Sequence, residues 1–280
     1  MENEDDFEEQ EPITEVTDED IKNGVNIDGA LYSPDGLRLL HCNKNVTDLE
    51  IREGTTIICD EAFDTCDISS VIIPDSVTTI GFGAFCDCSS LEIIEIPASV
   101  TYIGTGAFFQ CSSLENIVIS APLTYIESNT FEKCYSLKNI AIPDSVTSIE
   151  DHAFSNCRSL ESIEIPDSVT FIGDNAFADC SSLEDIEISG SVTFIDSDTF
   201  CGCSSLKSIV IPDSVTSIGE NAFSGCEALE SIVIPASVTS IGEDVFEKCH
   251  ELYEIIIPSG NLTKFEKLLP KELHPCLIEQ

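Results

Sequence analysis

A unit of 23 residues recurs along most of this 280-residue chain, and no other sequence feature restricts its fold as strongly. Ile142–Ile165 holds one complete unit, in which a proline is followed eleven residues later by Phe154 and three residues after that by Cys157. A shorter, degenerate unit comes first and contains Phe63 and Cys66. A fixed period of about 20–50 residues predicts a solenoid, in which each unit forms one rung and packs on its neighbours. The later units carry the same pair of residues at Phe85/Cys88, Phe108/Cys111, Phe131/Cys134, Phe154/Cys157, Phe177/Cys180, Phe200/Cys203, Phe223/Cys226 and Phe246/Cys249.

Each unit also predicts its own secondary structure. The spacing L-x-x-I-x-I over residues 160–165 places two isoleucines on one face of a short strand and Ser162 and Glu164 on the other. Pro166 ends this strand, because proline cannot donate to a β-ladder. A second short extended segment follows, and the spacing of Asn175–Cys180 favours a short 3₁₀ or α turn. We therefore expect Phe154 and its equivalents to form one continuous buried column.

The pattern I-P-x-S-V-T-x-I-G-x-x-A-F-x-x-C-x-x-L resembles the BspA-like class of leucine-rich repeats over about residues 46–258. This resemblance implies a right-handed leucine-rich-repeat solenoid of α/β class, built mostly from short parallel strands joined by 3₁₀ or helical turns. It also implies binding of cell-surface or host proteins, which many members of the family perform. The chain differs from the surface members because it shows no export signal and no anchor, and we therefore expect a cytoplasmic protein. A cell-surface location, reached by another export route, is the alternative.

Both ends of the array carry expected caps. L-Y-S-P-D-G at residues 31–36 predicts a turn between two short strands, so residues 21–45 are expected to form an N-terminal β-hairpin cap. Residues 259–280 are expected to form a helical C-terminal cap, with Phe265, Leu268 and Leu269 in one apolar stripe. Both segments are similar to those that often begin and end arrays of this family.

The chain is strongly acidic, with 52 Asp and Glu against 12 Lys and Arg and a formal net charge of -40. Nucleic acid and anionic membranes would need a basic surface, so neither is an expected partner. No apolar stretch approaches the roughly 20 residues of a membrane-spanning helix. Residues 1–20 are read as a disordered acidic tail. The charge either attracts a basic partner or keeps the protein in solution and apart from its own copies.

Nine of the 14 cysteines share one repeat position, beside residues of buried type. We expect reduced thiols packed as small hydrophobic groups, which fits a reducing compartment. A zinc site is not expected, because Cys86-x-Cys88 and Cys201-x-Cys203 lack a second pair nearby. No nucleophile motif, phosphate-binding loop or dinucleotide motif occurs, so neither enzymatic activity nor a cofactor is expected.

The outward positions of the predicted strands define a concave surface, along which solenoids generally bind. Apolar residues such as Ile72 and Val210 occupy its ends, and acids gather in its middle. The alternative is that the Val and Ile residues serve only strand propensity. The residues predicted to bind a partner on this surface are Glu95, Asn116, Asn139, Ser162, Glu164, Asp185 and Glu187.

A second column contains Tyr102, Tyr125, Phe171 and Phe194, as two pairs from neighbouring units. If these rings are exposed, they are anchors for a protein partner. If they turn inward, they pack in the core.

These observations favour a non-enzymatic, monomeric scaffold that binds a partner protein, basic in character, through its concave strand surface. An adhesin that recognises host matrix protein or glycan is the alternative, and a structural spacer without a partner is the third possibility.

Overall fold

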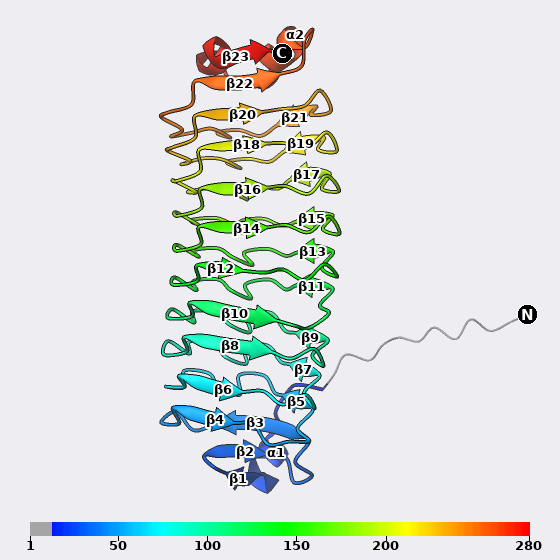
Figure 1. Cartoon of the computed structure of the whole chain (residues 1–280), viewed down its shortest axis with the longest axis vertical. Helices are drawn as coiled ribbons and strands as arrows, with labels where there is room; N and C mark the ends of the chain where they lie inside the picture. Colours follow the sequence, from blue (N-terminus) through cyan, green and yellow to red (C-terminus); the bar gives the residue numbers. More distant parts are fainter. Residues whose placement is uncertain (1–12) are drawn as a thin grey trace, which may run out of the picture.

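Stacked rungs form one column in the computed structural model, with the N-terminal end of the array at one extreme and the C-terminal end at the other (Figure 1). The structure describes residues 13–280; residues 1–12 of the expected acidic tail lie outside the described residues. The 23-residue period predicted this parallel-strand solenoid correctly.

Each rung contributes a strand to a first row, and neighbouring strands of the row are parallel where they pair. The register repeats with the unit, since Asn116 lies opposite Ile93 and Asn139 opposite Asn116. Outward and inward residues alternate, as the strand period of two requires. The strands of this row are β4 (Asp48–Glu50), β6 (Ser70–Ile72), β8 (Ile93–Ile96), β10 (Asn116–Ile119), β12 (Asn139–Ile140), β14 (Ser162–Glu164), β16 (Asp185–Glu187), β18 (Ser208–Val210), β20 (Ser231–Val233) and β22 (Glu254–Ile257).

A second row of two-residue strands runs along another side of the column (Figure 1). Each strand ends in an isoleucine; the residue before it is exposed in strands such as Tyr125–Ile126 but buried at Thr79 and Ser148. The strands of this row are β5 (Ile57–Ile58), β7 (Thr79–Ile80), β9 (Tyr102–Ile103), β11 (Tyr125–Ile126), β13 (Ser148–Ile149), β15 (Phe171–Ile172), β17 (Phe194–Ile195), β19 (Ser217–Ile218) and β21 (Ser240–Ile241).

The segment that carries the repeat phenylalanine is not a helical turn, and that prediction was wrong. Asn175 and Asp179 adopt positive φ, which interrupts a right-handed helix. The backbone N–H groups of Asn175, Phe177 and Asp179 instead donate to carbonyls of the next rung, at 3.1, 2.9 and 2.7 Å. Alternate residues thus form a ladder between rungs, and the residues between them close tight turns within the rung. This turn segment satisfies its polar backbone groups without forming a helix.

The core is one continuous cluster that runs the length of the array. Phe154 is fully buried, as predicted, and its ring stacks on Phe131 and Phe177 with ring centroids 5.4 Å apart on each side. The same stacking joins every repeat phenylalanine, the one three residues before each column cysteine, from Phe63 to Phe246. Each rung therefore buries apolar surface against two neighbours, which is how a solenoid gains stability.

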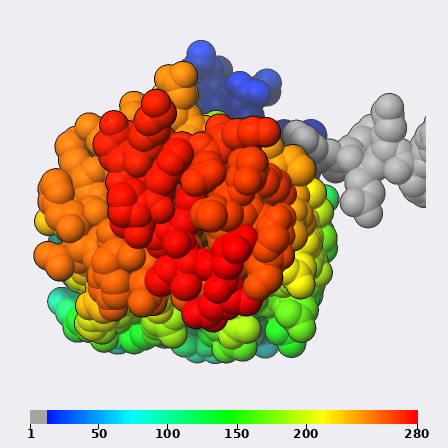
Figure 2. Space-filling view, turned by 90° about the horizontal axis from the view of Figure 1, so that it is seen from above, coloured from blue at the N-terminus to red at the C-terminus, as the bar shows by residue number. Residues whose placement is uncertain are grey.

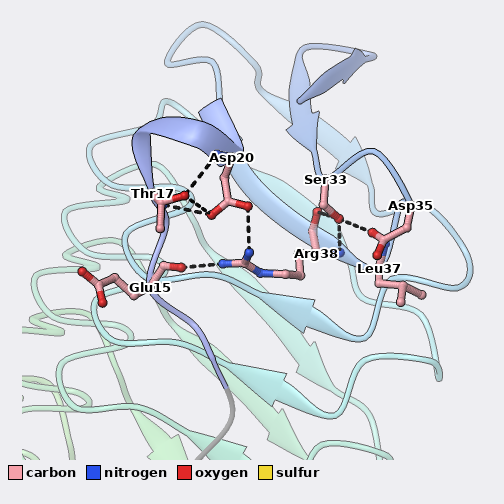
Figure 3. A network of polar contacts seen from close by, with 7 residues as sticks. All are labelled: Glu15, Thr17, Asp20, Ser33, Asp35, Leu37 and Arg38. Atoms are coloured by element: carbon pink, nitrogen blue, oxygen red, sulfur yellow. Dashed lines mark hydrogen bonds and ion pairs between the residues drawn. The ribbon is translucent and has the colours of Figure 1, made fainter. Parts of the chain in front are cut away.

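Three antiparallel strands, β1 (Val25–Ile27), β2 (Ala30–Tyr32) and β3 (Arg38–Cys42), stand at the N-terminal end. Strand β3 then pairs in parallel with β5, so this segment extends the second row of strands. The turn at Ser33-Pro34-Asp35-Gly36 is held by the Asp35 carboxylate, which accepts hydrogen bonds from the Ser33 hydroxyl and the Leu37 N–H (Figure 3).

Residues 13–20 correct the expectation of a disordered tail over residues 1–20. A short helix, α1 (Asp18–Asn23), begins with a capping box in which Thr17 and Asp20 satisfy each other's backbone N–H groups. Arg38 holds this segment in place: it forms an ion pair of 3.0 Å with Asp20 and donates to the Glu15 carbonyl (Figure 3). Acidic composition alone suggested disorder, whereas the cap and one arginine from β3 order these residues.

At the other end, helix α2 (Leu262–Leu268), the 3₁₀ helix η1 (Lys271–Cys276) and strand β23 (Leu277–Glu279) follow the last rung. Phe265 is fully buried and Leu269 nearly so, and both join the core cluster. Strand β23, which the sequence did not predict, pairs in parallel with β22. Seen end-on, this segment and the last rung cover this end of the column (Figure 2). Among residues 13–280 we find no helix of the length and apolar character needed to cross a membrane.

Candidate interaction surface

The outward side chains of the first row form a continuous surface, which we call the strand strip. Its seven predicted partner-binding residues are all exposed: Glu95, Asn116, Asn139, Ser162, Glu164, Asp185 and Glu187. Their inward neighbours are buried isoleucines, for example Ile163 and Ile186. Alternation along each strand therefore presents the polar side chains without exposing the core.

The middle of the strand strip concentrates negative charge. The parallel register sets Glu164 directly opposite Glu187 and Ser162 opposite Asp185. Strands that pair in this way lie roughly 4.8 Å apart, so the carboxylates of Glu164 and Glu187 share one small area. The side chains of Glu164, Asp185 and Glu187 therefore give this part of the surface a concentrated negative charge.

A surface cavity of about 470 Å³ opens where strands β14 and β16 end. Four carboxylate side chains line it, those of Asp144, Glu164, Asp167 and Glu187. Neither Asp144 nor Asp167 was among the predicted residues. The P-D-S turn could have indicated both residues. Each Asp directly follows the proline that ends a strand, so it lies close to the last outward residues of the strands.

Lysines reduce the repulsion between the glutamates that directly follow the repeat leucine in neighbouring rungs. Lys138 pairs with Glu115 at 2.8 Å and Lys207 with Glu184 at 2.9 Å, in each case across one rung. The hydrogen bond and the charge of the glutamate raise the pKa of each lysine. Both pairs are about half exposed, so their effect on stability is small.

The predicted aromatic column lies on the second row of strands, so its four residues form a surface separate from the strand strip. Tyr102 and Tyr125 are 39% and 51% exposed, so their rings do not turn into the core. Phe171 and Phe194 are half-buried and meet edge to face, with centroids 5.7 Å apart. Ser148 lies between Tyr125 and Phe171 in the register and is buried there.

The 14 cysteines all fall within residues 13–280 and are free thiols. Burial raises the pKa of Cys180 in the core column to about 12, so its thiol stays protonated. One group that could hold a metal ion occurs among the described residues, namely Asp64, Cys86 and Asp87, with ligand atoms within 4.8 Å of one another. Burial and the neighbouring carboxylates raise the pKa of Cys86 to about 12, which opposes the thiolate form that binds metals. The expectation of no metal stays a prediction.

Parallel strands at a 23-residue spacing, an inward leucine and isoleucine framework and an outward polar strip define a leucine-rich-repeat solenoid, a class that generally serves as a non-enzymatic scaffold. The model of the BspA-type leucine-rich repeat region matches residues 40–161 and 147–269, and the chain belongs to this family. The resemblance to BspA-like repeats is thereby confirmed. This repeat family indicates a protein-interaction scaffold.

Among solved structures, the chain is similar to a leucine-rich cell surface protein from Faecalibacterium prausnitzii, with 36% sequence identity, a TM-score of 0.58 and coverage of 80% of this chain and 63% of that one. It is also similar to a leucine-rich repeat protein from Eubacterium ventriosum, with 23% identity, a TM-score of 0.51 and coverage of 73% and 50%. The second likeness shows the fold alone. The chain thus spans less than two thirds of the length of these two proteins. No curated protein matches it.

Proposed function

We propose that this protein is a non-enzymatic scaffold that binds a basic partner protein through the strand strip. The observation that carries the proposal is the acidic middle of the strip, where Glu164, Asp185 and Glu187 are exposed on paired strands. The cavity at the ends of these strands adds Asp144 and Asp167 to the same negative area.

The strand strip combines an acidic middle with exposed apolar side chains towards its ends. The acidic middle attracts a basic patch and speeds its encounter, an effect that salt weakens. Apolar side chains at the ends supply area to bury: Ile72 and Ile93 are 59% and 58% exposed, and Val210 is 63% exposed. The partner that fits is a protein with a basic centre and apolar flanks. Because the net charge is -40, we infer that the protein does not bind nucleic acid and does not insert into a membrane. We also infer that it is a monomer, since copies with this charge repel one another.

The experiment compares three immobilised baits: the native protein, the triple variant Glu164→Lys, Asp185→Lys, Glu187→Lys, and a control triple variant Glu220→Lys, Glu227→Lys, Glu243→Lys. The control changes the net charge equally at exposed acids away from the strand strip. A partner captured by the native and control baits, released by added salt and lost from the first variant supports the proposal. Equal capture by all three baits contradicts it.

The aromatic column offers a second surface for the same function, because Tyr102 and Tyr125 are exposed. Replacing Tyr102, Tyr125, Phe171 and Phe194 with serine uses a residue that the column already contains at Ser148 and Ser217. Loss of capture in this variant, with normal capture by the strip variant, would move the binding surface to the aromatic column.

An adhesin is the second candidate function, and the observation that favours it is the similarity to a bacterial cell surface protein. We infer a cytoplasmic location from the free thiols, because oxidising compartments favour disulfides. Labelling of intact cells with a membrane-impermeant reagent distinguishes the two. Labelled protein would establish the surface location and favour the adhesin.

A further inference from the structure

Two phenylalanines interrupt the polar side of the column formed by the turn segments. Phe82 is 53% exposed, and Phe109, one rung further, is half-buried. The repeat phenylalanines of the core occupy a different position, so neither ring belongs to the core column. Every other rung carries a polar residue at the position of Phe82: Asp60, Thr105, Ser128, Asp151, Asp174, Ser197, Glu220 and Glu243. At the position of Phe109 the other rungs carry small or polar residues: Asp64, Cys86, Glu132, Ser155, Ala178, Cys201, Ser224 and Glu247.

The same two rungs have glycine where all the others have a side chain. Gly83 and Gly106 adopt φ of 55° and 62°, yet the equivalent Asn129 and Asn175 adopt 59° and 57°, so this conformation does not require glycine. A Cβ added at Gly83 or Gly106 would meet its nearest neighbours at 3.6 and 3.7 Å, which is ordinary contact. Glycine at these two positions therefore leaves open a space that a side chain fills elsewhere. The other rungs use Glu61, Asn129, His152, Asn175, Asp198, Asn221 and Asp244.

The open space is a cavity of about 270 Å³ between Phe82 and Phe109. Its interior is mainly apolar, with Gly83, Gly106 and the neutral thiol of Cys86 beside the two rings. Sites for small molecules usually measure about 300–1,000 Å³, so a hollow of this size suits a single side chain. An exposed aromatic ring beside an apolar hollow is typical of a protein-binding anchor site.

The border of the cavity is acidic. Glu61 and Asp64 line it, and Asp87 lies next to Asp64 and Cys86. Lys133, whose ammonium group lies 4.5 Å from the centre of the Phe109 ring, is already paired with Glu132 at 3.0 Å. The net charge around the opening is therefore negative, and it favours a basic residue on whatever inserts an apolar group.

We propose that this cavity is a second docking site, on the turn segments and separate from the strand strip, for one apolar side chain of a partner protein that carries a basic residue beside it. Charge selects this occupant over two others. Residues 1–12 carry Glu and Asp but no Lys or Arg, and a second copy of the chain has a net charge of -40; the acidic border repels both.

The test titrates two short capped peptides, in which one phenylalanine is flanked by lysines or by glutamates, into the isotope-labelled protein. Amide shifts of Cys86 and Thr105, both at the cavity, report binding by NMR. The lysine peptide should shift them saturably, and the glutamate peptide should not. The variant Gly83→Asn, Gly106→Asn fills the cavity with a residue that the repeat tolerates at Asn129 and Asn175, and it should weaken binding by about tenfold or more. Phe82→Thr with Phe109→Ser should weaken it similarly.

The triple lysine variant of the strand strip should bind the lysine peptide as the native protein does, so failure of this site and failure of the strip are distinguishable. Equal binding by the filled variant, equal binding of the glutamate peptide, or no shift of Cys86 and Thr105 would overturn the proposal. So would tighter peptide binding after Phe7→Ser, which would show that the chain's own N-terminal segment is the occupant. Shifts of the same amides on dilution of the protein alone would identify a second copy instead.

Discussion

The thiol of Cys157 donates a hydrogen bond of 3.2 Å to the backbone carbonyl of Phe131, one rung earlier. That carbonyl also accepts the N–H of Cys134 from its own rung at 3.1 Å. The same thiol bond joins every neighbouring pair of rungs from Cys88 to Cys249, at 3.1–3.2 Å. The cysteine column is thus a ladder of weak hydrogen bonds inside the core as well as a row of small apolar groups.

Cys157→Ala should lower the free energy of unfolding by about 1–3 kcal/mol, because it removes the bond to Phe131 and leaves a small void. Urea denaturation measures the change. Cys201→Ala is the matched control: this thiol is half-buried outside the column, and Ala178 already occupies the same place one rung earlier. Equal losses in the two variants would contradict a special role for the column.

Phe154→Ala should cost about 3–5 kcal/mol, since the ring is fully buried and stacked on both sides. Thermal or urea unfolding tests this value. Phe82→Thr serves as the control, because Phe82 is 53% exposed and Thr105 stands at its place in the next rung. A native unfolding midpoint in Phe154→Ala would mean that the register of the rungs is wrong.

Stability should fall as the solution becomes alkaline. Burial raises the pKa of Cys180 from its ordinary value of 9.0 to about 12, so above pH 9 the unfolded chain loses a proton that the folded chain keeps. The stabilisation from this thiol is complete below pH 9 and is lost as the pH rises towards 12. The loss amounts to about 1.4 kcal/mol per pH unit for each such thiol.

The check is the difference in unfolding free energy between the native protein and Cys180→Ser from about pH 8 to about pH 10.5. Serine does not titrate there, so the difference should move against the native protein as the pH rises. A difference that is constant across this range would show that the thiol ionises equally in both states.

Arg38→Gln should release residues 13–23, because Arg38 holds them through Asp20 and the Glu15 carbonyl. Trypsin should then cleave after the exposed Lys22 faster than in the native protein. Arg158→Gln removes the same charge at a distant rung, where the guanidinium lies over Tyr135, and should leave this cleavage rate unchanged. An unchanged rate in Arg38→Gln would show that the capped helix holds its place without the arginine.

The repeat made most of the fold predictable. A residue such as Phe154 recurs at one position in rung after rung, so its burial follows from the period alone. The thiol bonds were not predictable, because Cys157 and Phe131 are distant in sequence and cysteine also packs well as a plain apolar group. Helix α1 was missed for a related reason: its partner Arg38 lies 18 residues from Asp20, and composition carries no information about that contact.

The strand strip was predictable residue by residue, because alternation in a strand decides which side chains point outward. The cavity beside Phe82 was not predicted, because a consensus of the repeats leaves out the residues by which single rungs differ from it. Phe82, Gly83, Gly106 and Phe109 stand out only when each position is compared down the whole array. The exposure of Tyr102 and Tyr125 depends on how neighbouring rungs pack, and the sequence left it open.

Carbodiimide labelling of carboxylates in the captured complex tests the central claim most directly. If the partner binds the acidic middle of the strand strip, Glu164, Asp185 and Glu187 should label more slowly in the complex than in the free protein, while Glu220 and Glu243 label equally in both. Unchanged labelling of the three strip carboxylates in a saturated complex would contradict the account.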